Sequence, residues 1–133
     1  IISGLSRGSN RKHIIRASLE SIAFQVSDLT FSIIKDLNRD LPCLKVDGGA
    51  SANNFLMQFQ SDILELDIHR PSNIESTALG AGLLSGIGAK LWDDLSNIKP
   101  TYKDINVFKP SISNNKRNQL LLRWKKAIKK SLQ

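Results

Sequence analysis

The chain has 133 residues, of which 41% are hydrophobic and 23% are charged. This length supports one compact domain with one main core, and the ordinary composition argues against disorder. No apolar run reaches the roughly 18 residues that a membrane helix needs, so no membrane partner is expected. The single cysteine, Cys43, excludes a disulfide within the chain. We therefore expect it to be a small core residue in a protein of a reducing, cytoplasmic compartment.

The net charge of +7 is concentrated at one end of the chain. Residues 1–98 hold nine Lys/Arg and eleven Asp/Glu, a net of −2, whereas residues 99–133 hold ten Lys/Arg and one Asp, a net of +9. A basic tail suits a nucleic-acid-binding or non-catalytic interaction module, and such a module stays the alternative function. Lysines on the outer face of a helix are usually only solvated, so we expect no nucleic-acid partner.

The first predicted element is a long amphipathic helix from His13 to about Asn38, with Ser9 or Asn10 as its cap. Apolar residues recur along it at steps of three or four, and such a stripe is expected to face the core. The stripe consists of Ile15, Leu19, Ile22, Val26, Leu29, Ile33 and Leu37.

Two short strands and two helices follow the first helix. Cys43–Val46 is predicted to be a strand that ends at the turn Asp47-Gly48-Gly49. A helix is expected over Ser51–Leu64, then a second strand over Leu66–Arg70, and then a helix over Ser76–Ala89. The last of these helices is rich in glycine and alanine, and each interior glycine costs a helix roughly 1 kcal/mol against alanine. We therefore expect it to pack closely against a neighbouring element.

The remaining residues are predicted to form smaller elements and one final helix. A helical turn is expected over Leu91–Asn97, a loop from Pro100, an extended piece over Ile105–Phe108, and a helix from the Ser113 cap to Leu132. The expected inner stripe of this last helix is Leu121, Trp124, Ile128 and Leu132. Because the two strands are separated by a helix, the chain is predicted to be an α/β domain with at least one parallel strand pair.

The unit that carries chemistry is the strand, the turn Asp47-Gly48-Gly49 and the following helix. A glycine pair permits positive φ and removes side-chain bulk, so a flat ligand can lie against the backbone. The helix start offers unpaired N–H groups, and Asn53 in its first turn could present an amide to a purine or a ribose. The residue types alone favour a plain tight turn and a local capping role for Asn53, and leave the nucleotide site as the alternative.

Other candidates for chemistry are weaker. His13 and His69 lack metal-ligand spacing with acidic residues, so no metal site is expected. Asp47 at its strand end could act as a base, but a role in stabilising the glycine turn is the favoured interpretation. No Ser-His-Asp or Cys-His arrangement can be argued from the spacing. We expect no catalytic residue in this chain.

Several runs of the sequence resemble the FGGY carbohydrate kinases, and cover essentially the whole chain. The matching runs are Gly4–Gly8, His13–Ala23, Val46–Asp62, Glu75–Gly82, Phe108–Pro110 and Trp124–Ala127. The long central run and the Glu75–Gly82 run are similar to the glycerol kinase branch of that family. Another sugar kinase of the family is the alternative.

The resemblance implies that residues 1–133 are part of a carboxy-terminal ATPase domain with the actin/hexokinase-like, ribonuclease-H-like fold. It also implies transfer of the γ-phosphoryl group of Mg-ATP to glycerol, giving sn-glycerol 3-phosphate. By motif, Gly49 and Asn53 would contact the adenine nucleotide and Gly48 would shape the turn, with the small-residue helix packed close behind. The chain starts at Ile1, with Met57 as its only methionine, so we expect a fragment that lacks the amino-terminal domain.

The resemblance assigns the rest of the catalytic machinery to that missing part. The phosphate-gripping loop, the glycerol contacts, the Mg²⁺ ligands and the catalytic aspartate would all lie upstream. The fragment alone is therefore expected to be inactive, with ATP or ADP as its own ligand. A homo-oligomer is expected only for the full-length enzyme.

Overall fold

The structure, a computed structural model, describes residues 1–94, 96, 98 and 105–132. Its elements in chain order are α1 (Arg11–Leu37), β1 (Leu44–Lys45), the 3₁₀ helix η1 (Gly49–Ala52), α2 (Asn54–Leu64), β2 (Ile68–Pro71), α3 (Ser76–Gly88), β3 (Ile105–Phe108) and α4 (Asn114–Ser131). The predicted strands and main helices are confirmed, with ends that differ by at most three residues. The expected turn at Leu91–Asn97 is a series of bends over residues 91–94; residues 95, 97 and 100 lie outside the described part.

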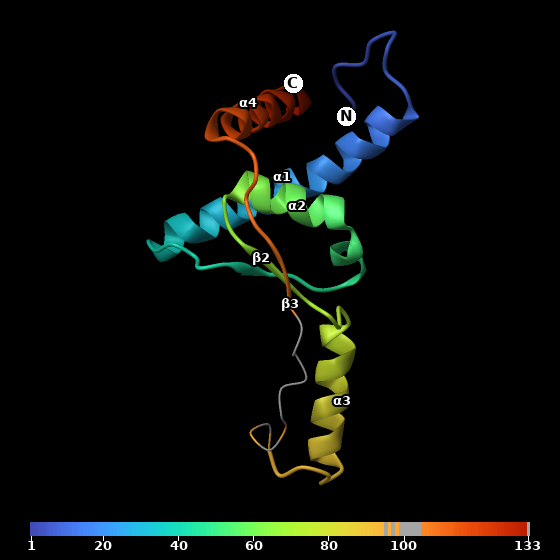
Figure 1. The fold of residues 1–133 in the computed structure, drawn as a ribbon, viewed down its shortest axis with the longest axis vertical. Helices are drawn as coiled ribbons and strands as arrows, with labels where there is room; N and C mark the ends of the chain where they lie inside the picture. The colour runs from blue at the N-terminus through green and yellow to red at the C-terminus, as the bar shows by residue number, and fades with distance from the viewer. Residues whose placement is uncertain (95, 97, 99–104, 133) are drawn as a thin grey trace.

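The strands form one small sheet in the order β1-β2-β3. β1 and β2 are parallel, with Leu44 opposite Ile68, whereas β2 and β3 are antiparallel, with Ile68 opposite Phe108. The parallel pair confirms the predicted α/β class, since its strands are joined through η1 and α2. The antiparallel third strand brings the carboxy-terminal segment back to the sheet (Figure 1).

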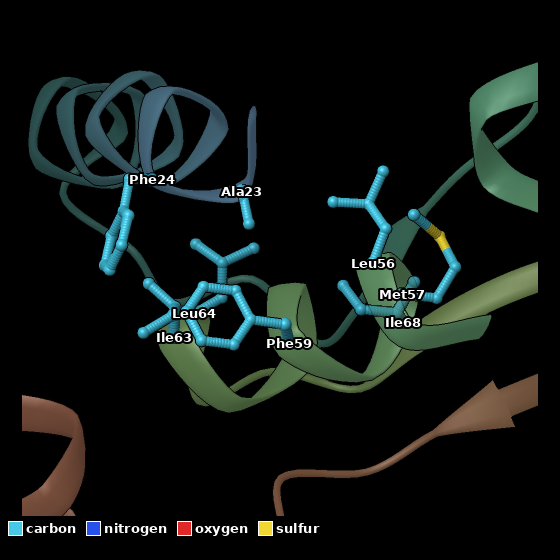
Figure 2. Packing of buried hydrophobic residues seen from close by; sticks show 8 residues of the cluster. All are labelled: Ala23, Phe24, Leu56, Met57, Phe59, Ile63, Leu64 and Ile68. Atoms are coloured by element: carbon cyan, nitrogen blue, oxygen red, sulfur yellow. The ribbon is translucent and has the colours of Figure 1, made fainter. Parts of the chain in front are cut away.

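Helix α2 is the centre of the hydrophobic core. It contacts α1 on one side, the sheet on another, and also α4. Eight of its eleven residues are buried, including Leu56, Phe59 and Ile63. Figure 2 shows Ala23 and Phe24 of α1 beside this helix, and the rings of Phe24 and Phe59 meet edge to face with centroids 5.4 Å apart. The apolar side chains of α2 therefore supply most of the core, although Phe55 remains 38% exposed.

The predicted burial of the α1 stripe is wrong for most of its members. The buried residues of α1 are Ala23, Phe24, Ser27 and Thr30, which lie on an adjacent part of the helix surface. Apart from Phe24 these side chains are small, which suits close packing of α1 on α2, and the amide of Gln60 donates to the carbonyl oxygen of Ala23 at 3.2 Å. The exposed stripe residues are Ile15, Ile22, Leu29, Ile33 and Leu37.

The small-residue helix α3 does not show the close packing that was expected. It extends away from the sheet, at the end of the molecule opposite α4 (Figure 1). A Cβ added at Gly80, Gly82 or Gly88 would meet no atom of the described residues within 4 Å. Only Gly86 is approached, because the ring of Trp92 covers it and would clash with any side chain. At Gly80, Gly82 and Gly88, the loss of helix stability that an interior glycine causes is not offset by a close contact within the described part of this chain.

Helix α4 is attached through Trp124, a member of its predicted inner stripe. Trp124 stacks on Phe24 with ring centroids 5.2 Å apart, and its indole Nε1 donates to Asp28 Oδ2 at 2.7 Å. The ring is therefore engaged inside the protein, as expected, and is not free to stack on a nucleobase. The rest of the predicted stripe is only partly confirmed, because Leu121 is half-buried while Ile128 and Leu132 are exposed.

Polar contacts from α2 hold the carboxy-terminal segment in place. The buried carboxylate of Asp62 accepts hydrogen bonds from the backbone N–H of Ser111 at 2.8 Å and from its hydroxyl at 3.0 Å. Arg117 of α4 donates to the carbonyl oxygen of Ile63 at 2.8 Å and pairs with Glu65 at 2.9 Å. A cation at the carboxy end of α2 also complements the helix dipole.

The bonds of Asp62 can be tested by Asp62→Ala. Hydrogen bonds to charged groups contribute about 1.5–3 kcal/mol, and burial leaves their partners without water. We therefore expect Asp62→Ala to lower the free energy of unfolding by about 2 kcal/mol in urea titration. Asp36→Ala, at an exposed position of α1, is the matched control. Equal stability of the two variants would contradict this role.

Candidate functional site

The predicted site centres on Gly48, which has a backbone conformation reserved for glycine. Its φ of 80° and ψ of 168° fall in a region that side chains exclude. Its N–H donates to the carbonyl oxygen of Ile74 at 2.7 Å, so the turn is bonded to the segment before α3. Gly48 therefore shapes the turn, as the sequence predicted.

Two residues that were not predicted to belong to the site hold the turn by hydrogen bonds. The hydroxyl of buried Ser51 donates to the carbonyl oxygen of Gly48 at 2.7 Å. Arg70, at the end of β2, donates from Nη1 to the carbonyl oxygen of Ser51 at 2.7 Å. By contrast, the carboxylate of Asp47 is exposed and makes no hydrogen bond with the described residues, so the predicted stabilising role of Asp47 is wrong. The sequence feature that could have indicated this role of Arg70 is an arginine at a strand end, because its guanidinium can reach a loop carbonyl.

Gly49 leaves the outer side of this turn open. A Cβ placed on Gly49 would meet no described atom within 4 Å, and its φ is not in the left-handed region. The residue itself is exposed, as is Ala50 beside it. Nothing among the described residues therefore requires a glycine at this position, and its backbone is open to approach from outside.

Asn53 caps α2 instead of lying within its first turn. Its backbone is extended, with φ −79° and ψ 105°, and its Oδ1 accepts from the N–H of Leu56 at 3.1 Å. The local capping role is therefore confirmed. The cap uses one of the two lone pairs of Oδ1, and the side-chain NH₂ of exposed Asn53 offers two donors to a ligand.

The three predicted binding residues lie on one tight turn. Gly49 is the first residue of η1, and Gly48 and Asn53 flank this helix, with the N–H of Asn53 bonded to the carbonyl oxygen of Ala50 at 3.2 Å. A neighbouring cavity of about 410 Å³ lies at the carboxy ends of β1 and β2. It is lined by Lys45, Val46, Asp47, His69, Pro71, Ser76 and Ile105. The turn thus borders a hollow with both charged and apolar groups.

Substitution by alanine is expected to lower the free energy of unfolding at Gly48 but not at Gly49. Gly48→Ala forces a side chain into a backbone region that costs about 1–3 kcal/mol, so the free energy of unfolding should fall by that amount. Gly49→Ala meets no neighbour and should change it by less than about 0.5 kcal/mol. Urea unfolding followed by circular dichroism measures both. Equal losses would show that the turn is not built as described.

Comparison with known proteins identifies the class to which this fold and turn belong. The model of the FGGY family of carbohydrate kinases, C-terminal domain, matches residues 1–89. The chain therefore belongs to the FGGY family of carbohydrate kinases. Among solved structures, a xylulose kinase from Rhodospirillum rubrum covers 98% of the chain at a TM-score of 0.66 and 22% identity, which shows the fold alone.

More similar relatives belong to one branch of the family. A glycerol kinase of Clostridium perfringens strain SM101 is 50% identical over 98% of this chain, and one of Haemophilus influenzae is 48% identical over 99%. The crystal structure of Plasmodium falciparum glycerol kinase with ADP matches 98% of the chain at 35% identity and a TM-score of 0.80. The chain spans 26% of the length of each of these three proteins. The predicted actin/hexokinase-like fold is thereby confirmed.

Proposed function

We propose that this chain forms the adenosine-binding wall of a kinase that transfers the γ-phosphoryl group of ATP to glycerol, giving sn-glycerol 3-phosphate. The observation that carries the proposal is the open turn at Gly49, beside the capped start of α2. Its support is the similarity to a glycerol kinase whose crystal structure is with ADP. Gly48, Gly49 and Asn53 are the proposed nucleotide contacts.

The geometry suggests what each residue would contribute. The missing Cβ at Gly49 would let the flat nucleoside lie on the backbone, while Gly48, Ser51 and Arg70 keep the turn rigid before the ligand arrives. Asn53 would act as a hydrogen-bond donor through its NH₂, which offers two N–H groups. Its NH₂ would therefore bind an acceptor atom, such as a purine nitrogen or a ribose oxygen.

The other parts of the reaction are proposed to lie outside these 133 residues. Phosphoryl transfer depends on holding the acceptor hydroxyl, the metal ion and the phosphates together. The Mg²⁺ ligands, the glycerol contacts and the catalytic base would come from the other three-quarters of a full-length kinase. A cytoplasmic location and a homo-oligomeric full-length enzyme also stay predictions. Among the described residues, no helix is long and apolar enough to cross a membrane.

Two substitutions at Asn53 separate nucleotide binding from helix capping. Asn53→Ala loses both the cap and the amide, whereas Asn53→Ser keeps a capping oxygen and loses only the amide. We expect the Kd for ADP, measured by calorimetry, to rise about fivefold to tenfold in both variants. This rise corresponds to the loss of one hydrogen bond, which contributes about 1 kcal/mol. Only Asn53→Ala should lose about 1 kcal/mol of stability. Unchanged affinity in Asn53→Ser would remove this amide from the site.

A chimera tests whether the chain supplies only the nucleotide side of a kinase. The purified chain should show no ATP-dependent phosphorylation of glycerol. Replacing the matching quarter of the C. perfringens enzyme with this chain should give a protein that phosphorylates glycerol, measured by coupled release of ADP. Activity of the isolated chain above background, or a folded chimera without activity, would contradict the proposal.

A further inference from the structure

Helix α4 and the amino-terminal half of α1 border a cavity that is separate from the proposed nucleotide site. The cavity has a volume of about 430 Å³, and none of Gly48, Gly49 and Asn53 lines it. Both of its helical walls lie at the end of the molecule opposite α3 (Figure 1). Small-molecule sites commonly have volumes of about 300–1,000 Å³, so this cavity is large enough to hold a ligand.

Much of the lining of this cavity is apolar. The apolar side chains that the two helices contribute are Ile14, Ala17, Phe24, Leu120, Trp124 and Ala127. Trp124 is fixed by its stacking on Phe24 and by the hydrogen bond from its indole to Asp28. The hydroxyls of Ser18 and Ser21, which also line the cavity, donate to carbonyl oxygens of their own helix at 3.0 and 2.8 Å. The α1 wall therefore suits an apolar ligand group.

Three cations of α4 also line the cavity. Arg123, Lys126 and Lys130 are separated by three and four residues, so they project from one face of the helix. Their side chains make no hydrogen bond or ion pair with the residues that the structure describes. The carboxylate of Glu20 lies in the same lining, but it is paired with Arg16 at 2.7 Å. The cavity therefore keeps an excess of positive charge that an anionic ligand would neutralise.

We propose that this cavity binds a single-chain anionic amphiphile, such as a fatty-acid anion. The carboxylate of the ligand would lie beside Arg123, Lys126 and Lys130, and its hydrocarbon chain would cover the apolar lining. Exposed cations hold an isolated anion weakly, whereas burial of a hydrocarbon chain adds a contribution that grows with the buried area. A ligand that combines both groups matches both parts of the lining. The proposal depends neither on the nucleotide contacts nor on glycerol as the acceptor.

The test titrates decanoate, below the concentration at which it forms micelles, into the purified chain and into the C. perfringens chimera. Calorimetry without ATP, ADP or glycerol should show one saturable site in both proteins. Decanol has a similar chain without the charge, and inorganic phosphate has charge without the chain. Each of these two probes should bind at least about fivefold more weakly than decanoate, because each engages only one part of the lining.

Two pairs of exposed lysines on α4 give a matched comparison. Lys126 and Lys130 line the cavity, whereas Lys125 and Lys129 do not. Lys126→Gln together with Lys130→Gln should raise the Kd for decanoate about fivefold, since exposed ion pairs are individually weak. Lys125→Gln together with Lys129→Gln should change the Kd by less than about twofold. Both double variants lose the same net charge, so a general attraction to the basic helix would weaken equally in the two.

Absence of saturable binding in either protein would overturn the site. Equal effects of the two lysine pairs would overturn it in favour of non-specific attraction to α4. Equally tight binding of decanol or of phosphate would overturn an anionic amphiphile as the ligand. Circular dichroism checks that each double variant folds, as expected for substitutions at exposed positions. Failure of ADP binding or of kinase activity would leave decanoate binding unaffected, so the two proposals fail separately.

Discussion

The burial of helix α2 is the constraint on which the rest of the structure depends. Its eleven residues lie against α1, the sheet and α4, and eight of them are buried. Buried polar groups on such a helix must find partners inside the protein. Gln60 therefore bonds to α1, Ser61 to the carbonyl oxygens of Leu66 and Phe108, and Asp62 to Ser111. The same side chains that satisfy α2 thus fix the position of its neighbours.

The candidate site depends on the start of this helix. Asn53 caps α2, and the turn from Gly48 to Asn53 delivers the chain from β1 to the cap. Because α2 is packed on several sides, the turn is held by the core and not only by its own hydrogen bonds. Rigid placement of an open backbone segment lowers the cost of ordering it on binding. The observed capping role and the proposed ligand-binding role therefore coincide at Asn53, which is why a serine substitution is needed to separate them.

Two surfaces of the chain remain incomplete within the described residues. The α1 stripe is apolar and exposed, and the glycines of α3 have no close neighbour at Gly80, Gly82 or Gly88. Both features were predicted from the sequence to be packed. Neither prediction holds within the described residues. Burial of a face depends on all the polypeptide around it, and the chain represents 26% of the length of its relatives.

The sequence by itself determined the elements and the location of the candidate site. Apolar periodicity defined α1, glycines defined the turn after β1, and Ser113 marked the start of α4. These are local properties, and neighbouring residues decide them. Only the tertiary structure decided that Arg70 holds the turn in place of Asp47, and that α2 covers the small side chains of α1. Those outcomes depend on contacts between distant segments, whose geometry the residue pattern does not contain.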